Sequence, residues 1–338
     1  MGRKPSIHTV AARAGVSPAT VSNVLNRKAS VSPAYAERVR AAVEELGYVA
    51  DQHAARLRSG RHSLAGVVVP DLANPMFSTF VSTLEHVARQ DGFDLLVVSS
   101  ANTPAEEAER LSTLRSWRPA GLIVIPCDGA LAARLPRGDY PPIVVADRIP
   151  DGGEFDLVAV DNAQAAGTVA AHMAGAGYRT CLVAGTTLGI SNVRERWEGV
   201  VAASGPMVPH LVESGLDPAG VRQRLRERLT GFQKPDALFT LDHVTTLIAY
   251  EEVTALGLAI PTDLAVASFD ETEWMRLVTP GLTAVCQPVE AMAQAAWTRL
   301  VRRMAHPHAA PETVRLPCAV NLRASTHRAD DRSHHEAA

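Results

Sequence analysis

The sequence predicts a small N-terminal all-α unit followed by a larger α/β body. The chain has 338 residues, about twice the usual length of one domain, so we expect more than one folding unit. Residues 1–62 contain ten basic and four acidic side chains, a net charge of +6, whereas the remainder of the chain carries −9. From Leu64 onward, apolar runs of strand length alternate with amphipathic helical stretches. A basic helical module therefore precedes an acidic body in which strands and helices alternate.

The composition is that of a globular protein. Hydrophobic residues make up 46% of the chain and charged residues 20%, which excludes extensive disorder and a small disulfide-stabilised scaffold. No apolar run approaches the ~18 residues needed to cross a bilayer, and the first residues lead into polar sequence, so we expect a cytoplasmic protein without a membrane partner. The four cysteines are too far apart for a zinc site, and we expect reduced thiols: Cys127, Cys181, Cys286 and Cys318.

Two helices joined by a glycine turn are predicted at the start of the basic module. Ser6 is a good N-cap for a helix that ends at Ala14, and Gly15 supplies the backbone freedom that a sharp turn requires. The second helix begins at Ser17 and Pro18, since proline at the first helical position lacks only an amide that would be unbonded there. This arrangement is typical of a helix-turn-helix.

A third helix is predicted from Pro33 to Leu46, where it closes a small core with the first two. The second helix of a helix-turn-helix enters the major groove of DNA, and its outer face here is expected to present Thr20, Ser22 and Asn23. An ordinary three-helix bundle is the alternative. The net charge of +6 favours nucleic acid, because basic side chains that neutralise phosphates release condensed counterions.

Several motifs along the chain extend this pattern. They are Ala14 to Asn26 (AGVSPATVSNVLN), Val31-Ser32, Glu44 to Tyr48 (EELGY), Val69 to Asp71 (VPD), Asn74-Pro75, Val160 to Asn162 (VDN), Arg196 with Gly199, Ser268 to Asp270 (SFD), Thr279 to Thr283 (TPGLT), Gln287-Pro288 and Leu322 to Ser325 (LRAS). Together, from residue 6 to about residue 326, they resemble the LacI/GalR family of bacterial transcription regulators. The resemblance implies an N-terminal all-α helix-turn-helix headpiece and an α/β periplasmic-binding-protein-like body of two doubly wound subdomains.

The resemblance also implies the domain boundaries. Residues 1–50 form the helix-turn-helix DNA-binding headpiece, residues 51–62 a hinge helix or linker, and residues 63–326 the effector-binding and dimerisation domain. That domain consists of two interleaved subdomains, with crossovers near residues 162, 288 and 320. Residues 327–338 form a disordered tail without leucine, so we expect a homodimer rather than the tetramer that family members build with a C-terminal leucine heptad.

The DNA contacts that the resemblance implies lie in the headpiece and the hinge. They are Ile7, Ser17, Pro18, Ala19, Thr20, Ser22, Asn23, Asn26, Ser32, Tyr35, Tyr48 and Leu57. Leu57 occupies the position of a hinge leucine that enters the minor groove, and three arginines surround it. An apolar wedge partly unstacks a base step and kinks the duplex, which gives an exposed leucine in a basic segment a physical use. The alternative is that Leu57 packs against the body.

Seven apolar segments of the body are predicted strands of parallel sheets covered on both faces. They are Leu64–Val69, Leu95–Val98, Leu122–Ile125, Ile143–Val145, Cys181–Ala184, Ala237–Thr240 and Leu264–Ala267. Parallel sheets bind ligands at the carboxyl ends of their strands, where this chain has Asp71, Asp147, Asp242 and Asp270. We therefore expect a polar ligand at these ends.

The resemblance places a small effector in the cleft between the two subdomains. The implied contacts are Met76, Phe77, Asp147, Asp161, Asn192, Arg196, Asp270 and Gln287. Carboxylates, amides and one arginine suit a polyhydroxylated or otherwise polar ligand, such as a sugar or a related metabolite, because each hydroxyl needs both a donor and an acceptor. Two alternatives stay open from the residues themselves. Asp161 caps a helix that begins near Asn162, and Arg196 is a surface charge on a helix over residues 191–203.

An enzyme and a transport-type binding protein are the alternative function classes. The chain lacks a Gly-x-Ser-x-Gly elbow and a Gly-x-x-x-x-Gly-Lys-Ser/Thr phosphate loop, and its histidine pairs bring no third ligand, so we expect no enzyme, cofactor or metal. A transport-type binding protein would need a signal peptide and would not contain a helix-turn-helix. We therefore expect a sequence-specific repressor that binds pseudo-palindromic double-stranded operator DNA as a homodimer under the control of a small polar effector.

Overall fold

The computed structural model describes residues 6–25, 31–48, 64–135, 140–231 and 234–328. The chain divides into two compact units, Met1–Ser63 and Leu64–Ala338. Asn26 and Leu57, both predicted to contact DNA, lie outside the described residues, as does the tail from residue 329. No helix in the described part of the chain is long and apolar enough to span a membrane.

The first unit contains three described helices, which begin and end where the capping residues predict. They are α1 (Ile7–Ala14), α2 (Pro18–Leu25) and α3 (Pro33–Leu46). Ser6 forms a reciprocal capping box with Thr9, and Gly15 ends α1 with a left-handed φ of 63°. Small apolar side chains join the three helices in one core: Val10, Ala11, Ala14, Val21, Val39 and Ala42. The predicted three-helix headpiece is confirmed.

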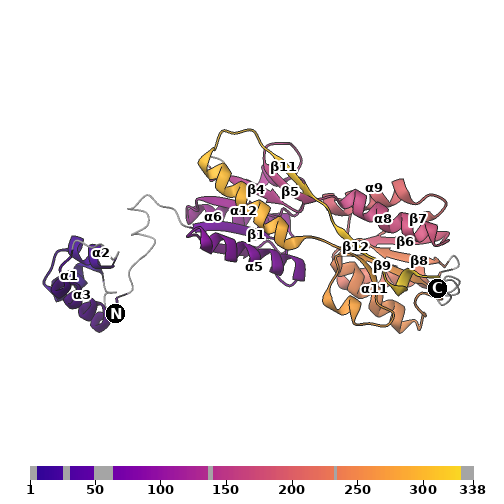
Figure 1. The fold of residues 1–338 in the computed structure, drawn as a ribbon, viewed down its shortest axis with the longest axis horizontal. Helices are drawn as coiled ribbons and strands as arrows, with labels where there is room; N and C mark the ends of the chain where they lie inside the picture. The colour runs from indigo at the N-terminus through magenta and orange to yellow at the C-terminus, as the bar shows by residue number, and fades with distance from the viewer. Residues whose placement is uncertain (1–5, 26–30, 49–63, 136–139, 232–233, 329–338) are drawn as a thin grey trace, which may run out of the picture. The chain divides into compact units, whose positions relative to one another are not determined.

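The body consists of two subdomains, each built around one sheet (Figure 1). Both sheets have six strands in the same order. The first sheet contains β1 (Leu64–Val69), β2 (Asp94–Ser99), β3 (Gly121–Val124), β4 (Ile143–Ala146), β5 (Asp156–Val160) and β11 (Thr313–Leu316), and the second contains β6 (Thr180–Gly185), β7 (Val208–Glu213), β8 (Ala237–Thr240), β9 (Ala265–Phe269), β10 (Thr283–Cys286) and β12 (Ala319–Asn321). Their orders are β11-β5-β4-β3-β1-β2 and β12-β10-β9-β8-β6-β7. Each pairing is parallel except that of β12 with β10. The predicted pair of α/β subdomains is confirmed.

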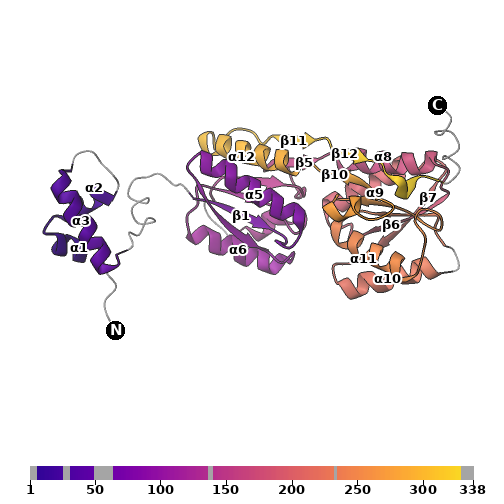
Figure 2. The same ribbon diagram turned by 60° about the horizontal axis from the view of Figure 1, so that its bottom comes forward.

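Helices cover both faces of each sheet (Figure 2). The N-terminal subdomain has α5 (Pro75–Gln90), α6 (Pro104–Ser116), α7 (Leu131–Arg134) and α12 (Val289–Ala305), and the C-terminal subdomain has α8 (Asn162–Gly175), α9 (Ser191–Ala203), α10 (Pro218–Thr230), α11 (His243–Ala255) and the 3-10 helices η1 (Glu273–Arg276) and η2 (Ala324–Thr326). Helices α5 and α12 pack on one face of the first sheet and α6 on the other; α8 and α9 pack on one face of the second sheet, α10 and α11 on the other. Burial on both faces explains why the inner strands are almost continuously apolar.

The chain passes between the two subdomains three times. It does so between β5 and α8, between β10 and α12, and between β11 and β12. These passages lie at residues 161, 287–288 and 317–318, each within three residues of the crossovers predicted near residues 162, 288 and 320. The N-terminal subdomain is therefore completed by α12 and β11, which come late in the chain.

A glycine allows α8 and α9 to pack closely. A Cβ atom at Gly199 would approach the carbonyl oxygen of Ala163 to 2.1 Å, and one at Gly167 would lie 3.2 Å from the carbonyl oxygen of Gly199. A larger residue at position 199 would therefore push the helices apart. The close packing holds α9, which contains Arg196, against the first turn of α8.

Candidate functional site

The start of α2 is fixed by contacts of Ser17. The Ser17 Oγ accepts a hydrogen bond from the Thr20 backbone N–H at 3.1 Å and lies 2.9 Å from the Thr20 hydroxyl oxygen. At the preceding turn, the Val16 N–H donates to the Ala11 carbonyl oxygen at 3.0 Å. Because both ends of the turn are bonded, α2 leaves it in a defined direction.

The predicted DNA contacts in the described headpiece differ in exposure. Ser17, Pro18, Ala19, Ser32 and Tyr35 are exposed, whereas Ile7, Thr20, Ser22, Asn23 and Tyr48 are half-buried. Ile7 and Tyr48 pack against the helical core, so at least part of each side chain supports the headpiece. The exposed first turn of α2 and the half-exposed Thr20 and Asn23 together form the kind of surface that a helix-turn-helix presents to a groove.

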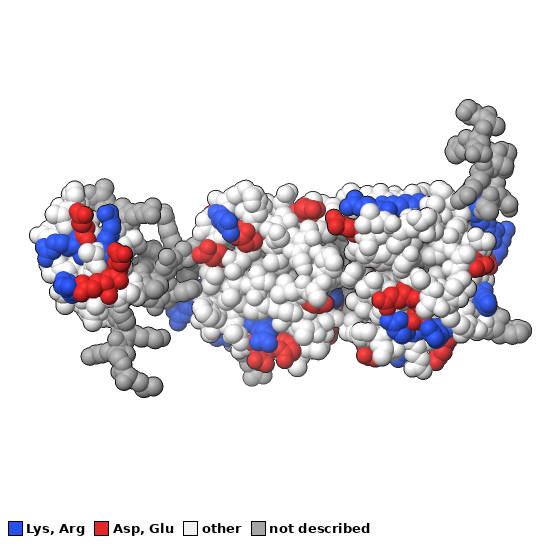
Figure 3. Space-filling view, turned by 90° about the horizontal axis from the view of Figure 1, so that it is seen from below, with Lys and Arg blue, Asp and Glu red and all other residues white. Residues whose placement is uncertain are grey.

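The net positive charge of the first unit comes from residues outside its described helices. The described part of this unit contains three basic and three acidic side chains, so its net charge of +6 belongs to the remaining segments. Figure 3 shows side chains of both signs on the described surface of this unit. Arg13 of α1 is paired with Glu45 of α3 at 2.7 Å. The net positive charge that would attract a polyanion therefore comes from the other segments of this unit, which contain residues such as Arg27 and Lys28.

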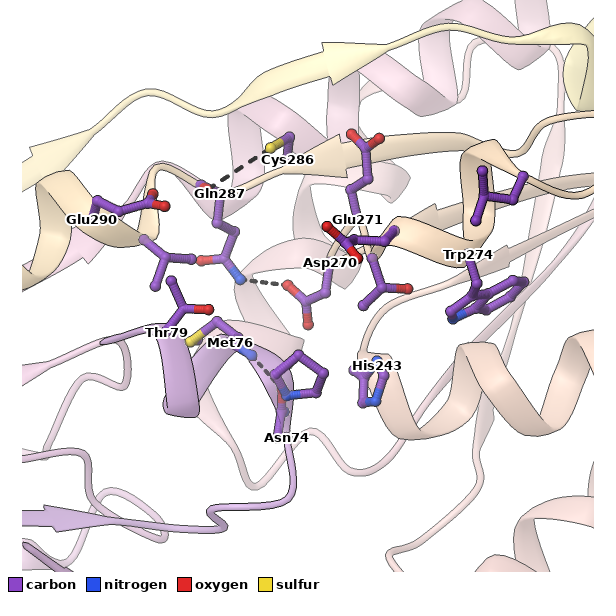
Figure 4. Close-up of a pocket in the computed structure, with 15 residues that line it drawn as sticks. Asn74, Met76, Thr79, His243, Asp270, Glu271, Trp274, Cys286, Gln287 and Glu290 are labelled. Atoms are coloured by element: carbon purple, nitrogen blue, oxygen red, sulfur yellow. Dashed lines mark hydrogen bonds between the residues drawn. The ribbon is translucent and has the colours of Figure 1, made fainter. Parts of the chain in front are cut away.

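A cavity of about 690 Å³ opens between the two subdomains of the body (Figure 4). It is lined by Asn74, Pro75, Met76, Thr79, His243, Asp270, Glu271, Thr272, Glu273, Trp274, Leu277, Cys286, Gln287, Val289 and Glu290. One wall is the first turn of α5 in the N-terminal subdomain. The opposite wall consists of the segments after β9 and β10 and the start of α11. The carboxyl ends of strands meet at this cavity, as expected for the ligand site of a parallel α/β fold.

Arg196 of α9 is buried beside the cavity residue Asp270. Its side chain is 2% exposed, so the alternative of a surface charge is wrong. The Nε donates to Asn162 Oδ1 at 2.8 Å and Nη1 donates to the Leu241 carbonyl oxygen at 2.7 Å. The Asp270 carboxylate lies 3.6 Å from Nη1, and the guanidinium lies 3.7 Å from the centre of the Phe269 ring. A buried cation is thus fixed by an anion, an amide, a carbonyl and an aromatic face.

Asn162 links Arg196 to an ion pair that crosses between the subdomains. Its Nδ2 donates to Glu195 Oε2 at 3.0 Å, while its Oδ1 accepts from Arg196. Glu195 also pairs with Arg315 of β11 at 2.7 Å. Because α9 and β11 belong to different subdomains, these contacts connect the position of Arg196 to the relative position of the two subdomains.

Two hydrogen bonds join the subdomains directly on this side of the body. Asn192 Nδ2 donates to Asp147 Oδ2 at 2.9 Å, and the Ile149 backbone N–H donates to Ser191 Oγ at 2.6 Å. The side chain of Asp147 is almost fully buried. Burial raises the pKa of Asp147, although the positive charge of Arg196 acts in the opposite direction.

Several buried polar atoms of this group have no hydrogen-bond partner among the described residues. They are Asp147 Oδ1, Asn192 Oδ1, Arg196 Nη2 and Gln287 Oε1. The other end of the Gln287 amide donates to Asp270 Oδ1, as Figure 4 shows. Buried polar groups in folded proteins are normally satisfied, so four such atoms in one group indicate a site that a polar ligand completes.

Two of the residues predicted to contact the effector have structural roles instead. Asp161 is the N-cap of α8 and accepts from the Gln164 N–H at 3.4 Å, which is the capping role that the sequence offers as its alternative. Phe77 is 5% exposed and packs in the core of the N-terminal subdomain, because its face of α5 points to the sheet. On the same helix, Met76 and Thr79 line the cavity instead.

Sequence reasoning missed several residues that line the cavity, among them His243, Trp274 and Glu290. His243 follows Asp242, the N-cap of α11, and Trp274 lies four residues after Asp270. Both lie within a few residues of a strand-end aspartate, and this proximity is the sequence signal for them, because ligands bind beyond the carboxyl ends of strands. Glu290 follows the second passage between the subdomains, at the start of α12, and no strand-end aspartate precedes it in the sequence.

The described residues offer no alternative metal centre. No three His, Cys, Asp or Glu side chains among them are grouped to hold a metal ion. The four cysteines are free, and burial raises the pKa of Cys181 to about 12, which keeps it a neutral thiol.

Comparisons with known families match the chain in three segments. Residues 6–51 match the bacterial regulatory proteins of the lacI family, and residues 62–215 match the periplasmic binding proteins and sugar binding domain of the LacI family. Residues 170–326 match a periplasmic binding protein-like domain. The HTH-type transcriptional regulator KdgR of Bacillus subtilis is 30% identical over 96% of this chain and 100% of its own length. The regulator PtxS of Pseudomonas aeruginosa is 31% identical over 95% of this chain and 96% of its own, and the ribose operon repressor of Escherichia coli is 28% identical over 88% and 92%.

Solved structures share the same fold. The lac repressor dimer bound to operator and the anti-inducer ONPF has a TM-score of 0.80 at 22% identity, covering 96% of this chain and 100% of that one. The complex of the transcriptional regulator CelR with cellobiose has a TM-score of 0.70 at 24% identity, covering 95% and 99%. A putative ribose operon repressor from Burkholderia thailandensis has a TM-score of 0.68 at 28% identity, covering 77% and 99%.

Proposed function

Because the chain belongs to the LacI family of bacterial transcription regulators, we propose that it binds operator DNA and changes its operator affinity when a small polar effector occupies the cleft of the body. The relatives include proteins named as repressors, and we assign this chain the same direction of control. The work of the protein is then binding rather than catalysis, in keeping with relatives that are named as transcriptional regulators and as an operon repressor.

The DNA-binding part of the proposal rests on the described helix-turn-helix. Helix α2 is the recognition helix, with its exposed first turn and Thr20, Ser22 and Asn23 toward the bases and phosphates of one half-site. Two headpieces of a homodimer read the two halves of a pseudo-palindromic operator. The related lac repressor is described as a dimer bound to its operator, which supports this arrangement. We place the protein in the cytoplasm, where the DNA is.

The effector part of the proposal is carried by one observation. Among the described residues, buried polar atoms of Asp147, Asn192, Arg196 and Gln287 lack a hydrogen-bond partner at the boundary of the two subdomains, as do His243 Nδ1, Thr272 Oγ1 and Trp274 Nε1 in the cavity wall. We assign these residues, with Met76 and Asp270, to the effector. Because they come from both subdomains, a ligand held by all of them favours one relative position of the subdomains over others. Coupling to the operator needs only that this position favours or disfavours the DNA-bound form.

Selection of binding sites from random DNA by the full-length protein tests the proposal. We expect a site with two-fold symmetry, and a dimer mass for the protein in sedimentation. Titration of that complex with neutral sugars then tests the effector, which should shift the operator affinity. Failure to select any sequence would contradict operator binding, and a selected site without symmetry would contradict the homodimer.

A further inference from the structure

We propose that a proton joins the two subdomains of the body at Asp147 and Asn192, where it is bound to the Asp147 carboxyl group and donated to the Asn192 amide oxygen. Asp147 follows β4 of the N-terminal subdomain, and Asn192 lies in the first turn of α9 in the C-terminal subdomain. We call these two side chains the acid–amide pair. The inference goes beyond the proposed function, because it concerns the contact between the subdomains without DNA or effector.

One half of the acid–amide pair is already formed. Asn192 Nδ2 donates to Asp147 Oδ2 at 2.9 Å, which fixes the orientation of the amide, since the opposite orientation would place two acceptor oxygens together. The remaining ends, Asp147 Oδ1 and Asn192 Oδ1, are buried and lack a hydrogen-bond partner among the described residues. Two acceptors cannot bond to each other, but a protonated carboxyl group donates through its O–H. A single proton on Asp147 Oδ1 therefore supplies the second bond of a cyclic pair and satisfies both atoms at once.

The acid–amide pair is buried away from the cavity. Asp147 is 1% exposed and Asn192 is 6% exposed, and neither is among the described residues that line the cavity. The partnerless groups of His243, Thr272 and Trp274, by contrast, all line it. Those three groups face a space that water or a ligand can fill. For the acid–amide pair, a proton needs no such space, because the carboxyl group itself carries it.

The surroundings of Asp147 favour the protonated form on balance. Burial is the largest effect and raises the pKa of Asp147; the charges of Arg196 and Arg148 act in the opposite direction, and that of Asp270 acts with burial. Both guanidiniums have other partners. Arg196 lies 3.6 Å from the Asp270 carboxylate, and Arg148 Nη1 donates to Asn102 Oδ1 at 2.7 Å and to two carbonyl oxygens after β3. Their attraction for the Asp147 carboxylate is therefore reduced.

The acid–amide pair couples the contact between the subdomains to pH. When the subdomains separate, water reaches Asp147 and its pKa returns to about 4. Closure then takes up one proton, so its equilibrium constant should fall by about tenfold for each pH unit between this value and the raised pKa of the closed form. The contact is strongest at low pH and weakens as the pH rises, because ionisation leaves an anionic oxygen opposite the amide oxygen. An effector that bonds to Asp147 or Asn192 must first open the pair.

Infrared spectroscopy of the full-length protein tests for the proton. At about pH 6, where ordinary carboxyl groups are ionised, we expect a C=O band of a protonated carboxyl group in the wild type. Asp147→Asn should lose this band; asparagine tolerates the φ of 63° at this position and can form the equivalent amide pair. Burial also raises the pKa of Asp242, so the substitution is needed to assign the band. In Asn192→Ala the band should shift, because the acid has lost its partner. No loss in Asp147→Asn, or no shift in Asn192→Ala, would overturn the proposal.

Hydrogen exchange of the Ile149 amide tests the coupling to pH. This N–H donates to Ser191 Oγ across the same boundary at 2.6 Å, so its protection measures contact between the subdomains. The wild-type protection factor should fall by about tenfold or more from about pH 5 to about pH 8, and that of Asp147→Asn should stay constant. Glu195→Gln is the matched control, because it removes a different link between the subdomains, the ion pair with Arg315. It should lower protection and retain the pH trend. A constant wild-type value, or an equal trend in Asp147→Asn, would show that this proton does not join the subdomains.

Discussion

Asp147 and Asp270 occupy equivalent positions in the two subdomains. Asp147 directly follows β4 and Asp270 directly follows β9, and each of these strands is third in the order of its sheet. Both residues have a left-handed backbone, with φ values of 63° and 71°. Arg196 pairs with Asp270 and acts electrostatically on Asp147. The repeated fold thus brings one carboxylate from each half of the body to the same buried guanidinium.

The ligand response should depend on Arg196 and Asp270. In Arg196→Ala or Asp270→Ala, loss of a charge-assisted hydrogen bond should cost ~1.5 to 3 kcal/mol of binding free energy. The affinity for the effector should therefore fall by tenfold or more. Operator affinity without effector should persist. Arg194→Ala on the same helix is the control, since Arg194 bonds to the Leu188 carbonyl oxygen in an exposed place. Titration of the operator complex with effector measures this response. If both alanine variants release the operator at the wild-type effector concentration, Arg196 and Asp270 do not belong to the effector site.

The pH dependence of stability should reveal Asp147. Burial raises the pKa of Asp147, so the folded chain retains this proton at a pH where the unfolded chain has lost it. Its contribution therefore lowers stability progressively as the pH rises from about 4. Asp147→Asn lacks this contribution, so its unfolding temperature should rise relative to that of the wild type as the pH increases above about 4. Glu109→Gln, on the exposed side of α6, should show no such trend. A constant difference for Asp147→Asn would mean that Asp147 titrates normally.

Gly199→Ala should destabilise the body. The added Cβ would overlap the Ala163 carbonyl oxygen, so α8 and α9 must separate, at a cost of ~1 to 3 kcal/mol in the free energy of unfolding. Gly175→Ala is the control, because no atom of the described residues lies within 4 Å of a Cβ atom there. Urea denaturation compares the two. Equal free energies of unfolding for the two variants would show that α8 and α9 can separate without loss of stability.

DNA binding should weaken steeply with salt, by on the order of a hundredfold between low and moderate salt if several phosphates are neutralised per dimer. Replacing both Arg27 and Lys28 by alanine should lower the slope of log affinity against log salt by about one for each side chain in phosphate contact. Arg13→Ala is the control, because Arg13 is already paired with Glu45. A nearly flat salt plot for the wild type would contradict the electrostatic role of the headpiece.

Asn23 is expected to read a base. Asparagine offers one donor and one acceptor, which match the N6 and N7 edge of adenine, whereas arginine suits guanine. Asn23→Arg should therefore change the selected sequence at one symmetric pair of positions, by ~1 to 3 kcal/mol per half-site. Site selection from random DNA with both proteins checks this. Uniformly altered affinity with the same selected sequence would assign Asn23 to the DNA backbone.

The helix starts and the central strands could be predicted because their signals are local. Ser6 and Gly15 bound α1 through capping chemistry, and the bounds of β1 follow from an uninterrupted apolar run. Strand β7 is not predicted, because it contains Pro209 and His210 and lies at the edge of its sheet, where Val212 is its one buried residue.

Predicting the candidate site required more than the sequence pattern. The resemblance placed Arg196 and Asp270 together, but the position of Phe77 in the core depended on how α5 rotates against the sheet. The bond from Asn192 to Asp147 joins two subdomains, and neither residue has a local signal for the other. Contacts of this kind follow from the packing of complete subdomains and not from nearby sequence.

The three passages between the subdomains also govern when the protein becomes competent during its synthesis. Strands β11 and β12, at the edges of the two sheets, are both made after residue 312, and α12 is made only shortly before them. Neither subdomain is complete while the ribosome is still translating that region. A premature stop codon before residue 313 would therefore damage both halves of the body at once. The chain would gain its ligand response only in the last steps of translation.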